Sequence, residues 1–403
     1  MKSIKRIIKQ GVGRLGPLVT LFSGNNGTTI FSDRDRHIYF GYYDLDPVDR
    51  GGKKLLAMAV SAEGGQSAGI PAEIGYFEVD NPRIFRPVGI SKAWCWQQGA
   101  RLQWFPNKSD DLIFYNTVHQ GKYSGVIQES SSKNIVFFLP RPLYAISSDG
   151  RWGLSINFAR LQRLRRGYGY SNLRDLTEGV DKPHDDGIWR VDLNSKEEKL
   201  LFSIKDISEG SRQSESAEHY FNHIMFNPDG SRFMFYHIWK YPDGKRKMRL
   251  LTADINGKNI YILNDSGHTS HCNWVSNSEI IMYGTCDDQG MNYYLCRDMS
   301  DHRQIVGKGI LKNDGHPSFI NSRWMITDTY PDVFRNQHLI LFDAKNNKRV
   351  IIKKLHSPLH FSGEVRCDLH PRPSLTGRHV CIDFVHNNKR AMMMIDVSRF
   401  IHH

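Results

Sequence analysis

One short module recurs along this chain: a polar turn containing Gly, Asp, Asn or Ser, followed by a short apolar or alternating run. The clearest copies are Pro47–Val60, Trp104–Thr117, Ser148–Phe158, Asn227–Trp239, Val275–Gly284, Ile320–Thr327 and Ser374–Phe384. Further strand-like runs follow inside the same units. Several short strands in a unit of about 40–50 residues are typical of a β-propeller. The sequence therefore predicts an all-β, seven-bladed β-propeller.

The modules also indicate the number of blades, and a strand-like run before the first module indicates how the ring closes. Seven modules predict seven blades, but six or eight remain alternatives because strand boundaries read from sequence are uncertain by several residues. The run Thr28–Phe31 is a candidate for the strand that closes the ring. We therefore expect residues 28–403 to form a single propeller domain.

The first 27 residues form a basic leader, in which Lys2, Lys5, Arg6, Lys9 and Arg14 are spread among apolar residues. Arg14 and several glycines interrupt any signal-peptide core, and no stretch of the chain has the apolar length needed to span a bilayer. We expect the leader to be poorly ordered or a short helix. The leader is either a solvated tail or a segment that attaches weakly to an anionic membrane surface.

The chain carries a formal net charge of +12, which favours a polyanionic partner. A nucleic acid, an acidic lipid and an anionic polysaccharide or oligosaccharide all fit this charge, and basic composition alone does not choose among them. A nucleic acid is a less favoured partner, because the sequence contains no clear platform of aromatic and basic residues. Six scattered cysteines fit reduced thiols or metal ligands better than a disulfide scaffold, and this favours a cytoplasmic protein.

Four histidines of the C-terminal half stand in the same small frame, at the start of a strand-like run that ends in a turn. They are His223, His271, His316 and His370. If the runs are equivalent strands of successive blades, the four imidazoles converge on one axis and form a metal or proton-transfer site. The alternative is four unrelated histidines at strand ends. Extending the frame to all blades predicts a channel lined by Asp44, Arg101, Leu143 and the four histidines.

Neutral imidazole is a common ligand for zinc, manganese and iron. Cys367 adds a thiol three residues before His370, so His271, His316, Cys367 and His370 would make a tetrahedral set suited to zinc. Cys272 is the competing thiol.

Candidate acids and bases lie in a second cluster. His223 has Tyr220 as a near neighbour, and His237 ends the next predicted segment. His and Tyr serve as general acids and bases, so we take His223 and Tyr220 as catalytic candidates and His237 as a substrate contact. His119 and Arg101 are further catalytic candidates on earlier blades.

An unusually long interval separates Phe158 from Glu218, and long excursions in compact repeats are often functional. It contains Arg165, Arg166 and Tyr168, which could hold an anion and stack on a sugar. The alternative is an ordinary solvated, charged turn of helix.

The chain resembles the seven-bladed propeller polysaccharide lyases, the oligogalacturonate and ulvan lyases. The resemblance rests on blade pattern and on four segments: Ser270–Trp274, Gly315–Ser318, Asp328–Asp332 and Arg366–Arg372. It implies a divalent metal held by His271, His316, Cys367 and His370. The oligogalacturonate lyases have Gln at the position of Cys367 and His at that of Arg372, which shifts the expected metal from manganese towards zinc, and its role from catalytic towards structural.

The ulvan lyases carry a separate catalytic group of His, Tyr and Arg on earlier blades, and only His119 lies in the matching region here. The resemblance therefore implies β-elimination on a uronic-acid-containing surface polysaccharide, with Tyr220 or His223 as base and Arg101 on the carboxylate. Because this set is incomplete, enzyme activity stays open. The alternative is a non-catalytic, metal-stabilised propeller that binds a polysaccharide or a protein partner in surface-glycan metabolism.

Overall fold

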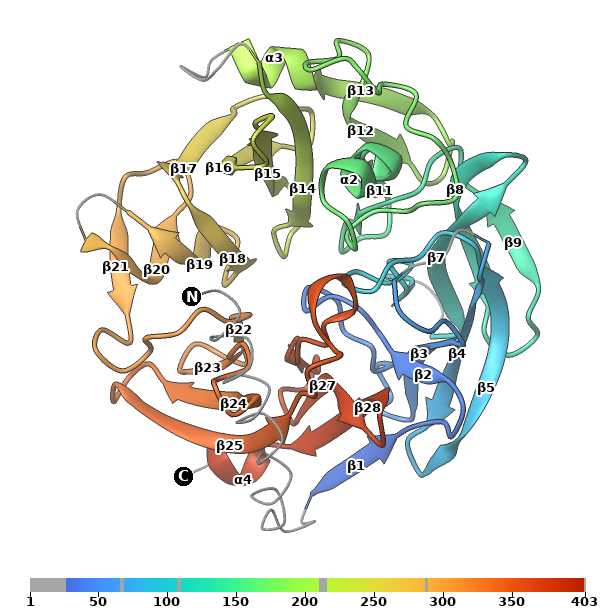
Figure 1. Cartoon of the computed structure of the whole chain (residues 1–403), viewed down its shortest axis with the longest axis vertical. Coiled ribbons are helices and arrows are strands. Elements are labelled where there is room, and N and C mark those ends of the chain that lie inside the picture. The colour runs from blue at the N-terminus through green and yellow to red at the C-terminus, as the bar shows by residue number, and fades with distance from the viewer. Residues whose placement is uncertain (1–26, 66–68, 107–109, 210–215, 287–288, 402–403) are drawn as a thin grey trace.

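Seven four-stranded antiparallel sheets surround a central axis in the computed structural model, which describes residues 27–65, 69–106, 110–209, 216–286 and 289–401 (Figure 1). The first three blades, from inner to outer strand, are β2 (His37–Tyr39), β3 (Lys54–Val60), β4 (Ala72–Glu78) and β5 (Asn81–Ser91); β6 (Gln103–Trp104), β7 (Leu112–His119), β8 (Lys122–Glu129) and β9 (Ile135–Phe138); and β10 (Ala145–Ile146), β11 (Trp152–Ser155), β12 (Gly187–Asp192) and β13 (Glu198–Ser203).

The next three blades are β14 (Glu218–Phe226), β15 (Arg232–Lys240), β16 (Arg246–Asp254) and β17 (Tyr261–Gly267); β18 (Thr269–Trp274), β19 (Glu279–Thr285), β20 (Met291–Arg297) and β21 (Arg303–Val306); and β22 (Ser318–Phe319), β23 (Trp324–Asp328), β24 (Asn336–Asp343) and β25 (Lys348–His356). The seventh combines β26 (Arg372–Pro373), β27 (His379–His386) and β28 (Lys389–Asp396) with β1 (Thr28–Phe31). The predicted seven-bladed propeller is confirmed.

The N-terminal strand closes the ring. Strand β1 pairs with β28 in the register Thr28↔Ile395 to Phe31↔Met392, so the first strand of the chain is the outer strand of the last blade. The predicted closure by Thr28–Phe31 is thereby confirmed. Residues 1–26 of the predicted leader, with the expected membrane contact, lie outside the described residues. In the part of the chain that the structure describes, no helix has the length and apolar character needed to cross a bilayer.

The core lies between neighbouring sheets. Six of the seven residues of β3 are buried, because both faces of this second strand pack against other blades. Strand β15 is buried over Phe233–Trp239 for the same reason. Strands that are covered on both faces require a continuous run of β-branched, aromatic and long apolar residues, without a clean alternation of polar and apolar positions.

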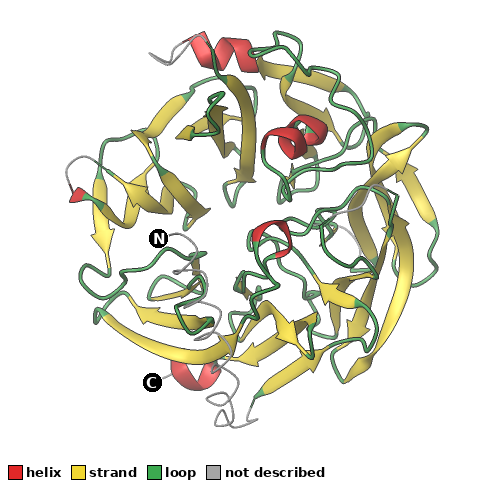
Figure 2. Ribbon diagram, viewed as in Figure 1, coloured by secondary structure: helices red, strands yellow, loops and turns green. Residues whose placement is uncertain are grey.

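Short helices lie near the channel and at the rim: α2 (Phe158–Leu164), α3 (Ile204–Glu209), α4 (Ser398–Ile401) and the 3₁₀ helix Gly363–Val365. Figure 2 shows α2 and the 3₁₀ helix beside the central channel. Helix α2 begins after Asn157, whose side chain accepts a hydrogen bond from the main-chain nitrogen of Arg160.

The segment between β11 and β12 is tied down by Arg160. Its buried guanidinium donates to the main-chain oxygens of His219, Thr177, Val180 and Asp181. The bond to His219 of β14 attaches the excursion to the fourth blade, and the other three bonds hold the excursion together internally. The basic residues that follow α2 are thus held near the channel.

Candidate functional site

The four histidines predicted to converge do so. Ring centroids are 4.0 Å apart for His271 and His316, 4.4 Å for His316 and His370, and 6.4 Å for His223 and His271. Arg101, His223 and His370 also share a left-handed backbone, with φ of 55°, 52° and 47°. This repeated conformation supports the assignment of equivalent positions in successive blades.

Three of these imidazoles have one ring nitrogen fixed by an oxygen. The Nδ1 of His316 lies 2.9 and 3.0 Å from the two carboxylate oxygens of Asp328, and that of His271 lies 3.0 Å from Asp314. The Nδ1 of His370 lies 2.7 Å from the carbonyl oxygen of Gly41. Each Nδ1–H is therefore the donor, and each Nε2 has a free lone pair whenever its imidazole is neutral. Such bonds commonly orient metal-ligating histidines.

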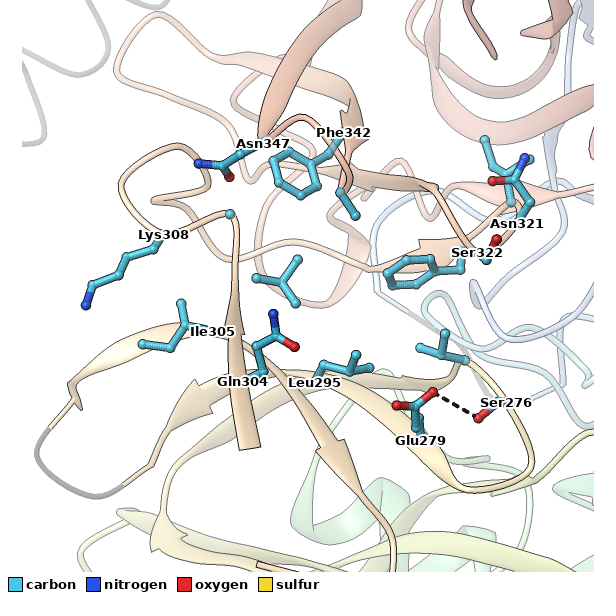
Figure 3. Close-up of a pocket in the computed structure, with 16 residues that line it drawn as sticks. Ser276, Glu279, Leu295, Gln304, Ile305, Lys308, Asn321, Ser322, Phe342 and Asn347 are labelled. Atoms are coloured by element: carbon cyan, nitrogen blue, oxygen red, sulfur yellow. Dashed lines mark hydrogen bonds between the residues drawn. The ribbon is translucent and has the colours of Figure 1, made fainter. Parts of the chain in front are cut away.

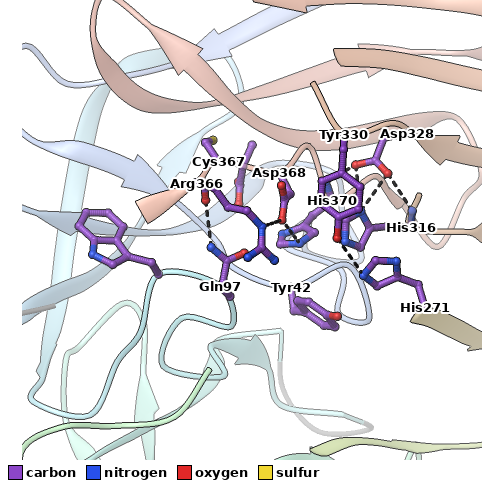
Figure 4. A network of polar contacts seen from close by, with 12 residues as sticks. Tyr42, Gln97, His271, His316, Asp328, Tyr330, Arg366, Cys367, Asp368 and His370 are labelled. Atoms are coloured by element: carbon purple, nitrogen blue, oxygen red, sulfur yellow. Dashed lines mark hydrogen bonds and ion pairs between the residues drawn. The ribbon is translucent and has the colours of Figure 1, made fainter. Parts of the chain in front are cut away.

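Figure 4 shows the rings of these three histidines close together, and their Nε2 atoms are the ones that these bonds leave for a ligand. Those of His316 and His370 are buried and have no hydrogen-bond partner among the described residues. Orphaned buried acceptors are rare, and a bound cation explains both. His316, His370 and Asp368 offer ligand atoms that all lie within 4.8 Å of one another, and we call these three residues the metal group. The donor set of two imidazoles and a carboxylate fits a divalent metal.

Cys367 is not a member of the metal group. Its side chain is buried, and burial raises the pKa of the thiol to about 12. A thiol binds metals as the thiolate, so this environment disfavours it as a ligand. His271 lies next to the group, with its Nε2 3.5 Å from the hydroxyl of Tyr330. Within the described residues, the carboxylate of Asp368, and not the thiol of Cys367, lies close enough to both His316 and His370 to share an ion with them.

The electrostatic surroundings distinguish the histidines. Burial, reinforced by neighbouring His316, holds the pKa of His370 well below its usual value, so this imidazole is neutral. Burial also lowers the pKa of His271, and again His316 adds to the effect. For His316 burial acts in the same direction, but the carboxylate of Asp328 outweighs it and raises the pKa.

A cavity of about 730 Å³ lies beside the metal group. Its charged lining is entirely cationic, and we call it the basic cavity. Its lining residues are Arg163, Leu164, Arg165, Arg166, Tyr168, Lys240, Gly244, Arg246, Tyr330, Gly363 and Arg366. Arg163 is neutralised by Asp175 and Glu218. Arg165 and Arg166 form no salt bridge within the described ranges, so they offer their charge to an anion.

Tyr168 stands between two guanidinium groups of the basic cavity. Arg165 lies over its ring at 3.9 Å, and Arg366 Nη2 donates to its hydroxyl at 2.6 Å. Burial alone would raise the pKa of Tyr168, but Arg165 and Arg366 favour the phenolate and lower it overall. Tyr168 is thus a phenol adapted to losing its proton.

Arg366 connects the basic cavity with the metal group. Its Nε donates to Asp368 Oδ2 at 2.7 Å while its Nη2 bonds to Tyr168 (Figure 4). The same oxygen of Asp368 lies 4.0 Å from His370 Nε2.

The catalytic candidates from the sequence have different surroundings. Arg101 is fully buried in a bidentate pair with Asp44, at 2.6 and 3.0 Å, so its guanidinium is taken up by the protein itself. The Nε2 of His223 lies 2.8 Å from the hydroxyl of Tyr42. Tyr220 is buried near Arg165 and Arg246; burial raises its pKa, although both cations oppose this.

Two further candidates lie apart from the channel histidines. His119 stacks on Phe138 of the outer strand β9, with ring centroids 3.7 Å apart. His237 is fully buried, bonded to His219 at 2.8 Å and to Arg249 at 3.1 Å. Neither lines the basic cavity. Of the expected substrate contacts, Arg165, Arg166 and Tyr168 do line it, whereas His237 does not.

Sequence reasoning missed Asp314, Asp328, Tyr330, Arg366 and Asp368. Asp328 begins one of the four segments that carry the resemblance, but it had no predicted role, whereas the structure shows that it holds His316. Arg366 and Asp368 flank Cys367 in the segment that ends at His370, and their charges are the sequence signal that could have identified them.

A second cavity, of about 710 Å³, lies between the fifth and sixth blades (Figure 3). Its lining includes Leu295, Ile305 and Phe342, and the carboxylate of Glu279 in this lining accepts a hydrogen bond from Ser276. This lining lacks the cluster of titratable groups that chemistry on an anion needs.

The fold and the site define a seven-bladed β-propeller with a basic cavity over a histidine cluster. The sequence matches no protein-family model and no curated protein at a significant level. Among solved structures, the chain is similar to an oligogalacturonate lyase in complex with manganese, with 16% identity, a TM-score of 0.67 and coverage of 95% of this chain and 96% of that one.

It is also similar to an oligogalacturonate lyase from Vibrio parahaemolyticus, with 13% identity, a TM-score of 0.61 and coverage of 94% and 96%. The expected resemblance is thus confirmed for the fold along nearly the whole chain. At this level of identity the likeness establishes the fold alone.

Proposed function

We propose that this protein cleaves a uronic-acid-containing polysaccharide or oligosaccharide by β-elimination in the basic cavity. The observation that carries the proposal is the position of Tyr168 between Arg165 and Arg366, the second of which also bonds to Asp368 of the metal group. An acidic sugar needs cations to bind its carboxylate and a base to remove the adjacent proton. The basic cavity offers both within one space.

The carboxylate of the sugar binds Arg165 and Arg366, which neutralise it and acidify the proton on C5. The phenolate of Tyr168 takes this proton, the C5–H electrons form the C4=C5 double bond, and the C4–O4 bond breaks with its electrons on O4. Burial raises the pKa of Tyr330 well above its ordinary value, so its hydroxyl stays protonated. Tyr330 lines the same cavity and donates the proton to O4.

The metal group would hold a divalent cation through His316, His370 and Asp368, with His271 next to it. Such a cation would add positive charge near the substrate carboxylate. The case for zinc depended on a thiol ligand, and with Asp368 in its place a set of imidazole and carboxylate suits manganese as well as zinc. We propose a divalent metal and leave both as candidates.

In this proposal, residues that line the basic cavity take the catalytic roles that the sequence suggested for Arg101, Tyr220, His119 and His223. Arg165 and Arg366 replace Arg101 at the carboxylate, because Arg101 is paired with Asp44. Tyr168 replaces Tyr220 and His223 as the base. We also propose a cytoplasmic location, which is supported by six cysteines that are all buried thiols rather than disulfides.

Binding without cleavage is the second candidate function. It is favoured by Arg372, which stands where the oligogalacturonate lyases have a histidine and is locked in a buried pair with Asp383 at 2.8 Å. A propeller that only clamps a cation and holds an acidic glycan would keep the basic cavity and need no base.

The test is ultraviolet absorbance of the conjugated C4=C5 uronate on a panel of uronic-acid glycans, with and without chelator. The proposal predicts that at least one glycan yields unsaturated product. Glycans that bind the protein while none yields product would favour the second candidate.

A further inference from the structure

Asp368 has two competing uses. Its Oδ2 accepts the hydrogen bond of Arg366 Nε at 2.7 Å and is the oxygen that lies 4.0 Å from His370 Nε2. A divalent metal held by the metal group needs a carboxylate oxygen at about 2.0–2.2 Å. An oxygen bound to a metal is a weaker acceptor for a guanidinium, and the cation itself repels Arg366.

The side chain of Arg366 has alternative partners in the basic cavity when its bond to Asp368 is broken. Its side chain lines the basic cavity, is 29% exposed and is already bonded to Tyr168. Its main chain is held separately, because its carbonyl oxygen accepts bonds from Gln97 at 3.0 Å and Arg390 at 2.7 Å. The side chain can therefore change partner while the backbone stays in place.

We propose that Arg366 is a switch that couples the metal group to the basic cavity. Without metal, Arg366 divides its donors between Asp368 and Tyr168. When a metal takes Asp368, Arg366 turns its freed donors to the carboxylate of the substrate. This inference rests on the proposed function for the identity of the anion. The competition between the metal and Arg366 for Asp368 does not depend on the proposed function.

Thermodynamic linkage makes the coupling reciprocal: a metal that raises the affinity for the anion is itself bound more tightly in the presence of the anion, by the same factor. Arg366 is thus a positioning residue whose effect is measurable in binding, without any turnover.

The experiment is calorimetric titration of metal-free protein with zinc chloride and with manganese chloride, with and without D-galacturonate as the anion. For the wild type we expect the metal to raise galacturonate affinity by about tenfold, and galacturonate to raise metal affinity equally. In Arg366→Gln the coupling factor falls to one. Because the competing ion pair is gone, this variant binds the metal several-fold more tightly than the wild type when no anion is present.

Arg166→Gln is the matched control. Arg166 lines the same cavity and is exposed, and no bond joins it to Asp368 among the described contacts. This variant binds galacturonate more weakly but keeps the coupling factor. Thermal unfolding of both variants checks that they are folded.

The switch is overturned if Arg366→Gln keeps the wild-type coupling, or if it binds metal no more tightly than the wild type. It is equally overturned if neither form binds a metal. If galacturonate binds to no form, the proposed substrate class fails instead, and the metal affinities of wild type and Arg366→Gln still decide the switch.

Discussion

The carboxylate of Asp328 holds His316 by both its main chain and its ring: Oδ1 accepts from the main-chain nitrogen at 2.7 Å and lies 2.9 Å from Nδ1. The second oxygen of Asp328 accepts from the main-chain nitrogen of His370 at 3.2 Å. One residue at the end of β23 therefore positions two residues of the metal group, which belong to successive blades.

Asp328→Asn is expected to weaken metal binding by about 10–100-fold, because the amide cannot accept from all three nitrogens and leaves the His316 ring poorly oriented. Calorimetric titration with zinc or manganese measures this. Asp343→Asn, which breaks a salt bridge with Arg323 in the same blade, is the control and should leave the affinity unchanged. Equal metal affinity in Asp328→Asn and the wild type would contradict the assigned role of Asp328.

Arg101→Gln is expected to lower the free energy of unfolding by about 3–5 kcal/mol, because it leaves the buried carboxylate of Asp44 without its partner. Denaturant unfolding measures the loss. The exposed pair of Arg378 and Asp396 offers a comparison, and Arg378→Gln should cost at most about 1 kcal/mol. If Arg101→Gln left stability intact and raised KM for an acidic glycan instead, Arg101 would be a substrate contact after all.

The pH dependence of kcat reports the protonation of Tyr168. As a base it must be deprotonated, so the rate rises with pH through the pKa of Tyr168, which Arg165 and Arg366 hold below its ordinary value. Arg165→Gln removes one of these cations, raises the pKa and moves the rising limb to higher pH. Ultraviolet titration of the tyrosinate should shift in the same direction. A rising limb at the same pH in both proteins would exclude Tyr168 as the titrating base.

The sequence was sufficient for the blades but not for all their strands. The second strands were visible because they are buried on both faces and follow polar turns, as in Lys54–Val60 and His379–His386. Outer strands such as Ile135–Phe138 and Arg303–Val306 are short and partly exposed, so they resemble turns.

The histidines were predictable because they occupy equivalent positions before or within the inner strands, where the repeat fixes their direction. The side chains of the segment that ends at His370 were not. Between the 3₁₀ helix and β26 the backbone has no regular period, so no rule decides whether Cys367 or Asp368 faces the axis. The excursion that carries Tyr168 is attached to the fourth blade by the bond from Arg160 to the carbonyl oxygen of His219, a contact that no local sequence pattern encodes.

The most direct test of the account compares Tyr168→Phe with Tyr170→Phe on a uronic-acid glycan that the wild type cleaves. Tyr170 is buried, accepts a bond from Asn116 and lies outside the basic cavity, so its variant controls for the loss of a phenol from the same loop. Measured by formation of the unsaturated uronate, kcat of Tyr168→Phe should fall by about 10²–10⁴-fold with glycan affinity largely kept, while Tyr170→Phe stays near the wild type. Wild-type kcat in Tyr168→Phe would contradict the account.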